Sequence, residues 1–315
     1  MTRDVAAELI TALEARNRRR SRRRIDVFYP EEGPLRRELY PKHMEYFAAG
    51  AKYRQRLMLA ANRIGKTESI GLYELTHHLT GCYPDWWQGR RFTKPVRAWA
   101  CGDTGKVVRE ILQHKLLGPT GSWGTGLLPG DLIVRVSRAM GVADAVDTVY
   151  VRHTSGKVSQ CTFKSYDQGR DAFQGTEQDV ILLDEEPKAA IHIECLMRTM
   201  TNNGMVMLTF TPLLGMSEVV LSFLSQRQTD ADLADQSKYV VTATWDDVPH
   251  LSTEAKAELW ASIPPFQRDA RSKGIPALGA GAIYPVQLSD IQIEDFELPK
   301  HWPRAYGLDV GWNRT

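Results

Sequence analysis

Short runs of apolar residues alternate along the chain with longer stretches whose apolar positions repeat with a helical period. The apolar runs lie at residues 57–61, 96–101, 180–184, 205–210 and 239–244. The longer stretches, which have the length of helices, lie at residues 66–80, 104–117 and 191–200. Because strands that are apolar throughout are buried on both faces, this alternation predicts an α/β fold whose mostly parallel sheet is sandwiched between helices.

Two regions depart from this pattern. Residues 131–164 carry short runs typical of β-strands, which predicts a hairpin excursion from the main sheet. Beyond residue 244, the segments 252–262 and 265–272 have the pattern of two helices in a smaller, lid-like subdomain. The Gly- and Pro-rich stretch 274–281 is typical of a connector.

Composition excludes several classes of protein. The chain has 315 residues, of which 43% are apolar and 25% charged, and these values are typical of a soluble globular protein. No stretch reaches the roughly 18–20 apolar residues of a membrane helix, so no membrane partner is expected. Four cysteines without a CxxC pair predict buried free thiols in a reducing compartment, and argue against a metal site or a disulfide framework.

The net charge of +2 conceals a strongly basic N-terminus. Residues 1–24 contain eight arginines and three acids, a net charge of +5, so the rest of the chain carries −3. Upstream of the arginine run, apolar positions 5, 9, 10 and 13 fit one face of a short helix. Three interpretations of this arm stand: a solvated tail, a phosphate-binding arm, or a docking helix for a partner subunit.

The run from Leu57 to Thr67 is typical of a buried strand that enters a phosphate-binding loop. In such a loop, backbone N–H groups at the start of a helix bind phosphate oxygens. Gly65 allows close approach, Lys66 reaches the β- and γ-phosphates, and the Thr67 hydroxyl ligates Mg²⁺. Ala60 stands where the first glycine of the motif is usual, which costs little if its φ is negative. We assign to ATP binding the loop residues Asn62, Arg63, Ile64, Gly65, Lys66, Thr67 and Glu68.

A second motif follows the apolar run 180–183, which ends in three acids, Asp184, Glu185 and Glu186. A strand that presents carboxylates to Mg²⁺ is the other half of a nucleoside-triphosphate site. Asp184 is the candidate metal ligand. Glu185 is the candidate base that orients the attacking water and accepts its proton.

Hydroxyls and arginines complete the candidate site. Thr209 lies in the next apolar run and Thr211 follows it, where a hydroxyl beside the metal strand can sense the γ-phosphate; a simple Thr-Pro strand end is the alternative interpretation. Arg63 and Arg170 are candidates for a finger that neutralises charge on the transferring phosphoryl group, with structural ion pairs as the alternative for each. Upstream, the rings of Tyr29, Tyr40 and His43 are placed where an adenine can stack.

These motifs resemble the large terminase subunit of tailed bacteriophages, the ATP-driven motor that packages DNA into a procapsid. The similarity extends over most of the chain, through residues 61–67, 169–179, 183–187 and 208–212. It implies a P-loop NTPase of the ASCE, RecA-like type, followed by a small helical linker subdomain and an RNase H-like nuclease. Mapped onto this chain, these parts are a basic arm at 1–27, the ATPase domain at 28–248, the lid or linker subdomain at 249–300, and the first nuclease strand at 301–315.

The resemblance also implies roles and partners. Lys66 and Thr67 would bind phosphate and magnesium, Asp184 and Glu185 would serve the metal and the water, and residues 209–212 would couple hydrolysis to motion. The partners would be double-stranded DNA, the portal protein and the small terminase subunit. The chain would form a homo-oligomeric ring on the procapsid, with a monomer as its state in solution. It would act in the host cytoplasm, docked at the portal, and be absent from the mature virion.

The final residues resemble the first strand of the nuclease, whose leading aspartate, here Asp309, is a metal ligand. A two-metal nuclease needs further carboxylates on other strands, and the sequence ends at Thr315. We therefore expect a motor domain without nuclease activity.

Two other functions fit parts of the pattern. A helicase is the nearest alternative, but it would need a second motor domain, for which no room follows residue 244. A DNA-binding adaptor with a weak ATP site is the second, but it would lack the lysine, the threonine or the base, and all three are present.

Overall fold

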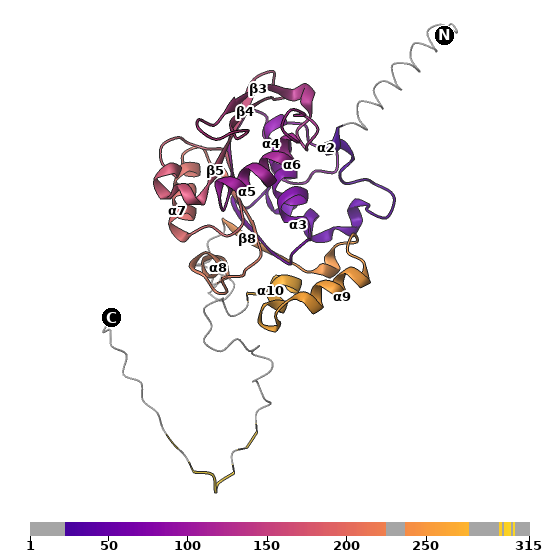
Figure 1. Cartoon of the computed structure of the whole chain (residues 1–315), viewed down its shortest axis with the longest axis vertical. Coiled ribbons are helices and arrows are strands. Elements are labelled where there is room, and N and C mark those ends of the chain that lie inside the picture. The colour runs from indigo at the N-terminus through magenta and orange to yellow at the C-terminus, as the bar shows by residue number, and fades with distance from the viewer. Residues whose placement is uncertain (1–22, 225–236, 277–295, 298, 304, 306–315) are drawn as a thin grey trace.

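The computed structural model describes residues 23–224, 237–276, 296–297, 299–303 and 305 (Figure 1). In this part of the chain eight strands form one sheet, in the order β3-β4-β5-β2-β6-β7-β1-β8. Their bounds are β1 Gln55–Ala60, β2 Arg97–Gly102, β3 Ile133–Arg138, β4 Val146–Arg152, β5 Val158–Ser165, β6 Val180–Asp184, β7 Met205–Phe210 and β8 Lys238–Ala243. The five predicted strands are all present, within two residues of the expected bounds.

The sheet is parallel from β5 through β2, β6, β7 and β1 to β8. Beyond β5 it continues with two antiparallel pairings, β5 with β4 and β4 with β3. The predicted hairpin excursion at 131–164 is therefore only partly right, because β5 pairs with β2 and extends the main sheet. Its buried positions alternate with partly exposed ones, a pattern that fits a half-covered strand of the sheet as well as a separate hairpin.

Helices cover both faces of the sheet. Figure 1 shows α7 and α8 on one side and α3, α4 and α6 on the other. Every residue of β6 and β7 is buried, and alternate side chains enter two separate cores. Leu182 and Met207 pack on the α4 side, while Leu183 and Leu208 pack on the α7 side. This burial on both faces explains why these strands contain almost no polar residues.

The predicted helices are also present, with an irregularity that the sequence does not indicate. Helices 66–80 and 105–117 each include a wider π-type turn, at Lys66–Leu72 and at Val108–Gln113. The α-helices are α2 Arg24–Val27, α3 Pro41–Ala49, α4 Tyr73–Thr80, α5 Gly105–Val107, α6 His114–Leu117, α7 Ala189–Met200, α8 Glu218–Leu224, α9 Thr253–Ser262 and α10 Arg268–Lys273. Among the described residues, no helix has the length and apolar character needed to cross a membrane.

A buried ion pair joins the strand before the loop at residues 61–65 to the helix after it. Arg56 of β1 donates two hydrogen bonds to the Glu74 carboxylate of α4, at 2.8 and 3.0 Å, and both side chains are fully buried. His78 contacts the same carboxylate at 3.1 Å, and the Tyr46 carbonyl accepts a further bond from Arg56 at 2.7 Å. The pair therefore fixes the position of α4 relative to β1, and with it the two ends of the intervening loop.

Two helices follow β8 at the positions predicted for the lid or linker subdomain. The Ser252 hydroxyl caps α9 by accepting a bond from the Ala255 N–H at 3.2 Å. After α10 the chain passes so close to β1 that a Cβ on Gly274 would lie 2.7 Å from the Ala60 Cα. The α10 end of this segment is thus packed against the sheet. The domain boundaries at 27, 248 and 300 remain predictions, and the arm at 1–22 and the segment 306–315 with Asp309 lie outside the described residues.

Candidate functional site

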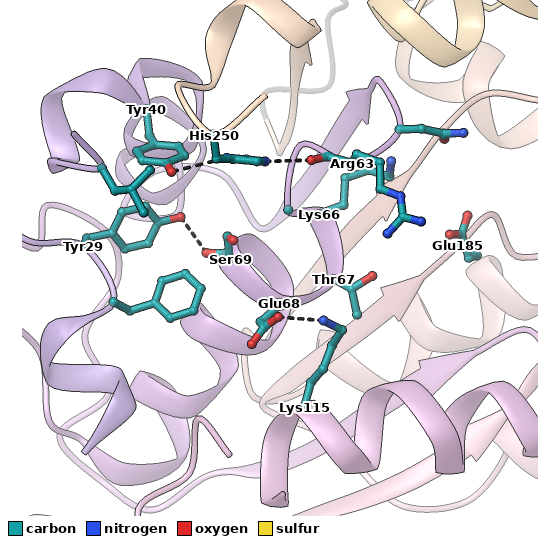
Figure 2. A pocket seen from close by; sticks show the side chains of 14 residues that line it. Tyr29, Tyr40, Arg63, Lys66, Thr67, Glu68, Ser69, Lys115, Glu185 and His250 are labelled. Carbon is teal, nitrogen blue, oxygen red and sulfur yellow. Dashed lines mark hydrogen bonds and ion pairs between the residues drawn. The ribbon is translucent and has the colours of Figure 1, made fainter. Parts of the chain in front are cut away.

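A cavity of about 600 Å³ opens at the carboxyl ends of the central strands (Figure 2). In an open parallel sheet, ligands bind outside these ends. One wall carries polar and charged side chains from the loop after β1, together with Glu185 after β6. The opposite wall carries apolar and aromatic side chains from the segment before α3, namely Phe28, Tyr29, Leu35 and Tyr40. The cavity therefore offers one end to an anion and the other to a ring.

The loop after β1 has the tight geometry that a phosphate-binding loop requires. Gly65 has φ +91°, and a Cβ at this position would lie 2.8 Å from the Ser69 Cβ, so a larger residue is excluded. Arg63 also has a positive φ, +65°, which is uncommon for a non-glycine residue. Ala60 has no such φ, as the sequence argument required. Ile64 has a fully buried side chain, so only its backbone can contact a ligand.

Lys66 lies at the centre of the polar wall. Its ammonium donates to the Ala61 carbonyl at 2.8 Å and to the Thr211 hydroxyl at 2.7 Å. Burial lowers the pKa of Lys66 to about 8, while the carboxylates of Glu185 and Asp184 act in the opposite direction. The lysine is thus a desolvated charge with acids nearby, an arrangement that suits an anionic ligand between them.

Two threonine hydroxyls hold the buried carboxylate of Asp184. Thr67 donates to one carboxylate oxygen at 2.9 Å, and Thr209 donates to the other at 2.8 Å. Burial, and then the charge of Glu185, raise the pKa of Asp184 to about 7, whereas the two hydroxyl bonds lower it. A hydroxyl and a carboxylate from different motifs therefore meet at one point, as the predicted metal ligands should.

Glu185 follows Asp184 at the strand end and lines the cavity. Its backbone is in the left-handed region, with φ +66°, and its N–H donates to the Thr209 carbonyl at 3.0 Å. Figure 2 shows Glu185 on the same side of the opening as Arg63 and Lys66. The carboxylate predicted to act as a base is therefore directed toward the loop predicted to bind phosphate.

The two threonines predicted to couple hydrolysis to motion both contact this machinery. Thr209 binds Asp184, as described, and Thr211 lies next to Lys66. The Thr211 hydroxyl also lies 2.8 Å from the Asn62 side-chain oxygen and 2.8 Å from the Ala60 carbonyl. One segment of chain thus contacts both halves of the site.

The two candidate finger arginines occupy different places. Arg63 lines the cavity and is exposed. Arg170 does not line the cavity: its guanidinium lies 3.6 Å from the Glu194 carboxylate on α7, and 57% of its side chain is exposed. Of these two arginines, only Arg63 is therefore brought to the site within this chain.

Other predicted contacts are only partly realised. Glu68 lines the cavity, but its carboxylate is paired with Lys115 at 2.6 Å and with Arg24. Of the three rings predicted to stack on adenine, Tyr29 and Tyr40 line the cavity and His43 does not. His43 lies next to Tyr29, with its Nδ1 2.7 Å from the Tyr29 hydroxyl, and burial lowers its pKa to about 3.

Sequence reasoning missed the residues after β8 that hold the loop. The His250 Nε2–H donates to the Arg63 carbonyl at 2.8 Å, and its ring is stacked on Tyr40 (Figure 2). The Trp245 indole donates to the Asn62 carbonyl at 2.9 Å, and the Asn62 N–H donates to the Arg271 carbonyl at 2.8 Å. No motif marks these residues, because strands β2 to β8 separate them from the loop in the sequence.

Comparison with known proteins places these features in one family. The family model described as "Terminase large subunit, T4likevirus-type, N-terminal" matches residues 57–291. The terminase large subunit of Salmonella phage P22 is 34% identical over 294 residues, which are 87% of this chain and 57% of that protein. The terminase large subunit of Enterobacteria phage LP7 is 36% identical over 155 residues, 49% of this chain and 31% of that protein. The matched part of this chain thus covers little more than half the length of the first relative and less than a third of the second.

Solved structures share the fold. The large terminase from a thermophilic bacteriophage superposes with a TM-score of 0.54 at 13% identity, over 76% of this chain and 53% of that one. A second structure of the same protein, in complex with ADP, superposes with a TM-score of 0.50 at 14% identity, over 77% and 53% of the two chains. These likenesses confirm the predicted P-loop α/β fold.

Proposed function

This chain belongs to the terminase large-subunit family, and we propose that it is the ATP-hydrolysing motor domain that drives double-stranded DNA into a viral procapsid. The observation that carries the proposal is the meeting of two motifs. Thr67, from the loop, and Thr209, from the strand beside β6, both bind the Asp184 carboxylate, while Lys66 and Glu185 line the same cavity.

The cavity fits ATP bound with its phosphates on the loop and its base on the aromatic wall. The amides between Asn62 and Thr67 would bind phosphate oxygens at the start of the helix, where the dipole favours anions. Lys66 would exchange the Thr211 hydroxyl for the β- and γ-phosphates. Tyr29 and Tyr40 line the other end, where a planar base can stack. The likeness to a terminase solved in complex with ADP supports the proposal that this chain binds a nucleotide.

The residues present also fit Mg²⁺. The described residues contain no group of three or more His, Cys, Asp or Glu side chains that could hold a metal by themselves. Mg²⁺ bound with a nucleotide needs only one or two protein oxygens, because phosphates and waters supply the rest. Thr67 and Asp184 would hold it, and the ion would neutralise charge between the β- and γ-phosphates.

Hydrolysis would rely on Glu185. From its position on the cavity wall, the carboxylate would orient a water toward the γ-phosphate and accept its proton. Arg63 would supply positive charge from within the chain, and Arg170, which does not line the cavity, would supply it to a neighbouring subunit. Loss of the γ-phosphate would then change the contacts of Lys66 with Thr211 and of Asp184 with Thr209. Through the bonds of Asn62 and Arg63 to Arg271 and His250, the same change would reach the segment after β8.

The family supports further proposals about assembly. We propose that the chain works in a homo-oligomeric ring, with the portal protein and the small terminase subunit as partners, in the host cytoplasm. It would contact DNA mainly through phosphates, so binding would be independent of sequence and steeply dependent on salt.

Steady-state ATP turnover by the 315-residue chain, with Lys66→Ala and Glu185→Gln as variants, tests this function. We expect Glu185→Gln to lower kcat by about 10²–10⁴ while ATP still binds, because only the base is lost. Lys66→Ala should lose binding as well. Lys52→Ala and Glu254→Gln, which change the same residue types outside the cavity, should turn over ATP like the unaltered chain. An unaltered chain that binds DNA but turns over no ATP would instead be an adaptor.

A further inference from the structure

The backbone of Glu185 is held in a conformation that a glutamate does not favour. The left-handed region costs a non-glycine residue about 1–2 kcal/mol, so the surrounding structure must maintain it. The peptide group before Glu185 is fixed by the bond from its N–H to the Thr209 carbonyl, at 3.0 Å. The peptide group after Glu185 must be held as well, by a contact to the Glu185 carbonyl, because φ and ψ together set the direction of the carboxylate.

That second support is the hydroxyl of Tyr166. It lies 3.1 Å from the Glu185 carbonyl and 3.1 Å from the Asp184 carbonyl, so one O–H group donates to two consecutive carbonyls. The Tyr166 side chain is almost fully buried, and its ring packs in the same core as Trp99 and Phe173. The hydroxyl therefore has little freedom to follow a moving backbone, and it holds the turn at a fixed place.

Tyr166 is itself firmly placed. It begins a short turn after β5, in which the Ser165 N–H donates to the Gln168 side chain at 3.2 Å. The Asp167 N–H donates to the Asp103 carbonyl at 3.2 Å, just after the neighbouring strand β2. Phe173, three residues beyond Arg170, returns to contact the Tyr166 ring, with centroids 6.4 Å apart. The segment that carries Arg170 is thus attached at both ends to the residue that holds Glu185.

We propose that Tyr166 is the positioning residue for Glu185: its hydroxyl holds the Asp184–Glu185 backbone in the left-handed turn and so directs the Glu185 carboxylate into the cavity. The inference rests on the proposed ATPase function. It assigns no chemistry to Tyr166, which lines no part of the cavity. It also connects the segment of the candidate finger Arg170 to the base, because a displacement of that segment would move the Tyr166 hydroxyl.

Tyr166→Phe tests the proposal, because it removes one oxygen and keeps the ring that packs in the core. Without the hydroxyl, the carbonyls of Asp184 and Glu185 lose this shared donor, and the turn can relax toward an ordinary conformation. An error of about 1 Å in a catalytic group can cost about 100-fold in rate, so we expect kcat to fall by about 10–100-fold. The Kd for ATP, measured in the Glu185→Gln background, should change by less than about twofold, since Tyr166 does not line the cavity.

Tyr46→Phe is the matched control. The Tyr46 hydroxyl is also buried and also lies near two backbone carbonyls, those of Arg56 and Leu208, at 3.3 and 3.4 Å. A general loss of stability would affect both variants, whereas a loss of positioning would affect Tyr166→Phe alone. Amide hydrogen exchange at residues 185 and 186 gives a readout that needs no turnover. It should be faster in Tyr166→Phe and unchanged in Tyr46→Phe.

Two results would overturn the inference. One is a kcat for Tyr166→Phe within about twofold of the unaltered chain, and the other is an equal loss of kcat in both Tyr→Phe variants. An unaltered chain without ATP turnover would contradict the proposed function instead. Unchanged exchange at residues 185 and 186 would then still refute the role of Tyr166 in holding the turn.

Discussion

At the scale of single residues, two threonine hydroxyls at the end of β7 form hydrogen bonds with one acidic and one basic side chain of the site. Thr209 donates to Asp184, and Thr211 contacts Lys66. Because the two residues are two positions apart, their side chains lie on the same face of the extended chain. Each hydroxyl is a neutral hydrogen-bond partner for a charged side chain. A bound ligand can take its place without competing with an opposite charge.

We predict that Thr211→Val lowers ATP turnover while Thr211→Ser retains it. Valine keeps the shape of threonine and removes the hydroxyl that contacts Lys66 and Asn62. A hydrogen bond to a charged group contributes about 1.5–3 kcal/mol, so kcat should fall by about 10–100-fold. Steady-state turnover with and without DNA measures the effect. Equal activity of the valine and serine variants, in turnover and in DNA translocation, would exclude a coupling role for this hydroxyl.

The sequence was informative about residues whose contacts are local or motif-defined. Lys66 and Thr67 closely follow a strand, and Asp184 ends one, so the chain order alone places them at the same edge of the sheet. Tyr166 and His250 were not predicted, because each acts through backbone carbonyls that are distant in the sequence. A tyrosine that positions a backbone has no residue pattern of its own.

At the scale of elements, the loop is held between a strand and a helix that are joined by a buried charge pair. We predict that Glu74→Gln destabilises the fold by about 3–5 kcal/mol, because Arg56 is left as an unpaired charge in a fully buried position. Urea unfolding of the variant measures this. Asp246→Asn is the control: Asp246 pairs with Lys256 at 2.8 Å, but its side chain is 88% exposed, so the expected loss is about 0–1 kcal/mol. Similar losses for both variants would show that the buried pair does not hold α4 to β1.

We also predict that His77, a buried histidine on helix α4, makes the stability of the fold depend on pH. Burial lowers the pKa of His77 to about 3, and its Nδ1 contacts the Cys82 carbonyl. The unfolded chain, with a histidine pKa of about 6.5, therefore takes up the proton first. The free energy of unfolding should therefore decrease as the pH falls below about 6.5. For this histidine the decrease should be about 1.4 kcal/mol per pH unit.

The variant His77→Asn, which keeps a donor for the Cys82 carbonyl, isolates this contribution. Between about pH 6.5 and pH 5 its unfolding free energy should fall less steeply than that of the unaltered chain, by about 1.4 kcal/mol per pH unit. The remaining slope would include His43, whose pKa burial also lowers to about 3. If the two slopes are equal, His77 takes up a proton without unfolding and the interpretation is wrong.

The elements that the sequence predicted well are those buried on both faces. Strand β6 occupies the predicted residues, because an uninterrupted apolar run of this length is typical of a strand that is covered on both faces. The pairing of β5 with β2 was missed, because alternation of buried and exposed positions identifies a half-covered strand but not its neighbour. The π-type turns were missed as well, since a shift of one residue in helical pairing leaves the apolar spacing nearly unchanged.

At the scale of the whole molecule, the two arginines imply different assemblies. Arg63 lines the cavity of its own chain, whereas Arg170 lies outside it and pairs with Glu194. The Arg170 side chain is 57% exposed, and Glu194 also pairs with Arg198 at 3.0 Å, so Arg170 can leave Glu194 for a better partner at small cost. A subunit interface over this surface would bring Arg170 to a neighbour's nucleotide.

We predict that Arg170 acts across such an interface. Turnover per chain should rise steeply with protein concentration, and Arg170→Ala should lower it by about 10³-fold or more. Mixing Arg170→Ala with Lys66→Ala should restore part of the activity, because the second variant lends its arginine to the intact loop of the first. Steady-state turnover of each variant and of the mixture is the measurement. A rate independent of concentration, with no recovery on mixing, would leave Arg63 as the finger of a self-sufficient site.

The hydrogen bonds between the loop and the segment after β8 also affect how the sequence of this site can change in evolution. The bond between Asn62 and Arg271 joins two backbone atoms, and His250 and Trp245 both donate to backbone carbonyls. Such bonds do not depend on which side chains stand at residues 63 and 271. Mutation can therefore exchange those side chains, and with them the charges at residues 63 and 271, while the loop keeps its attachment. The path of the loop backbone and the charges beside it are free to evolve at different rates.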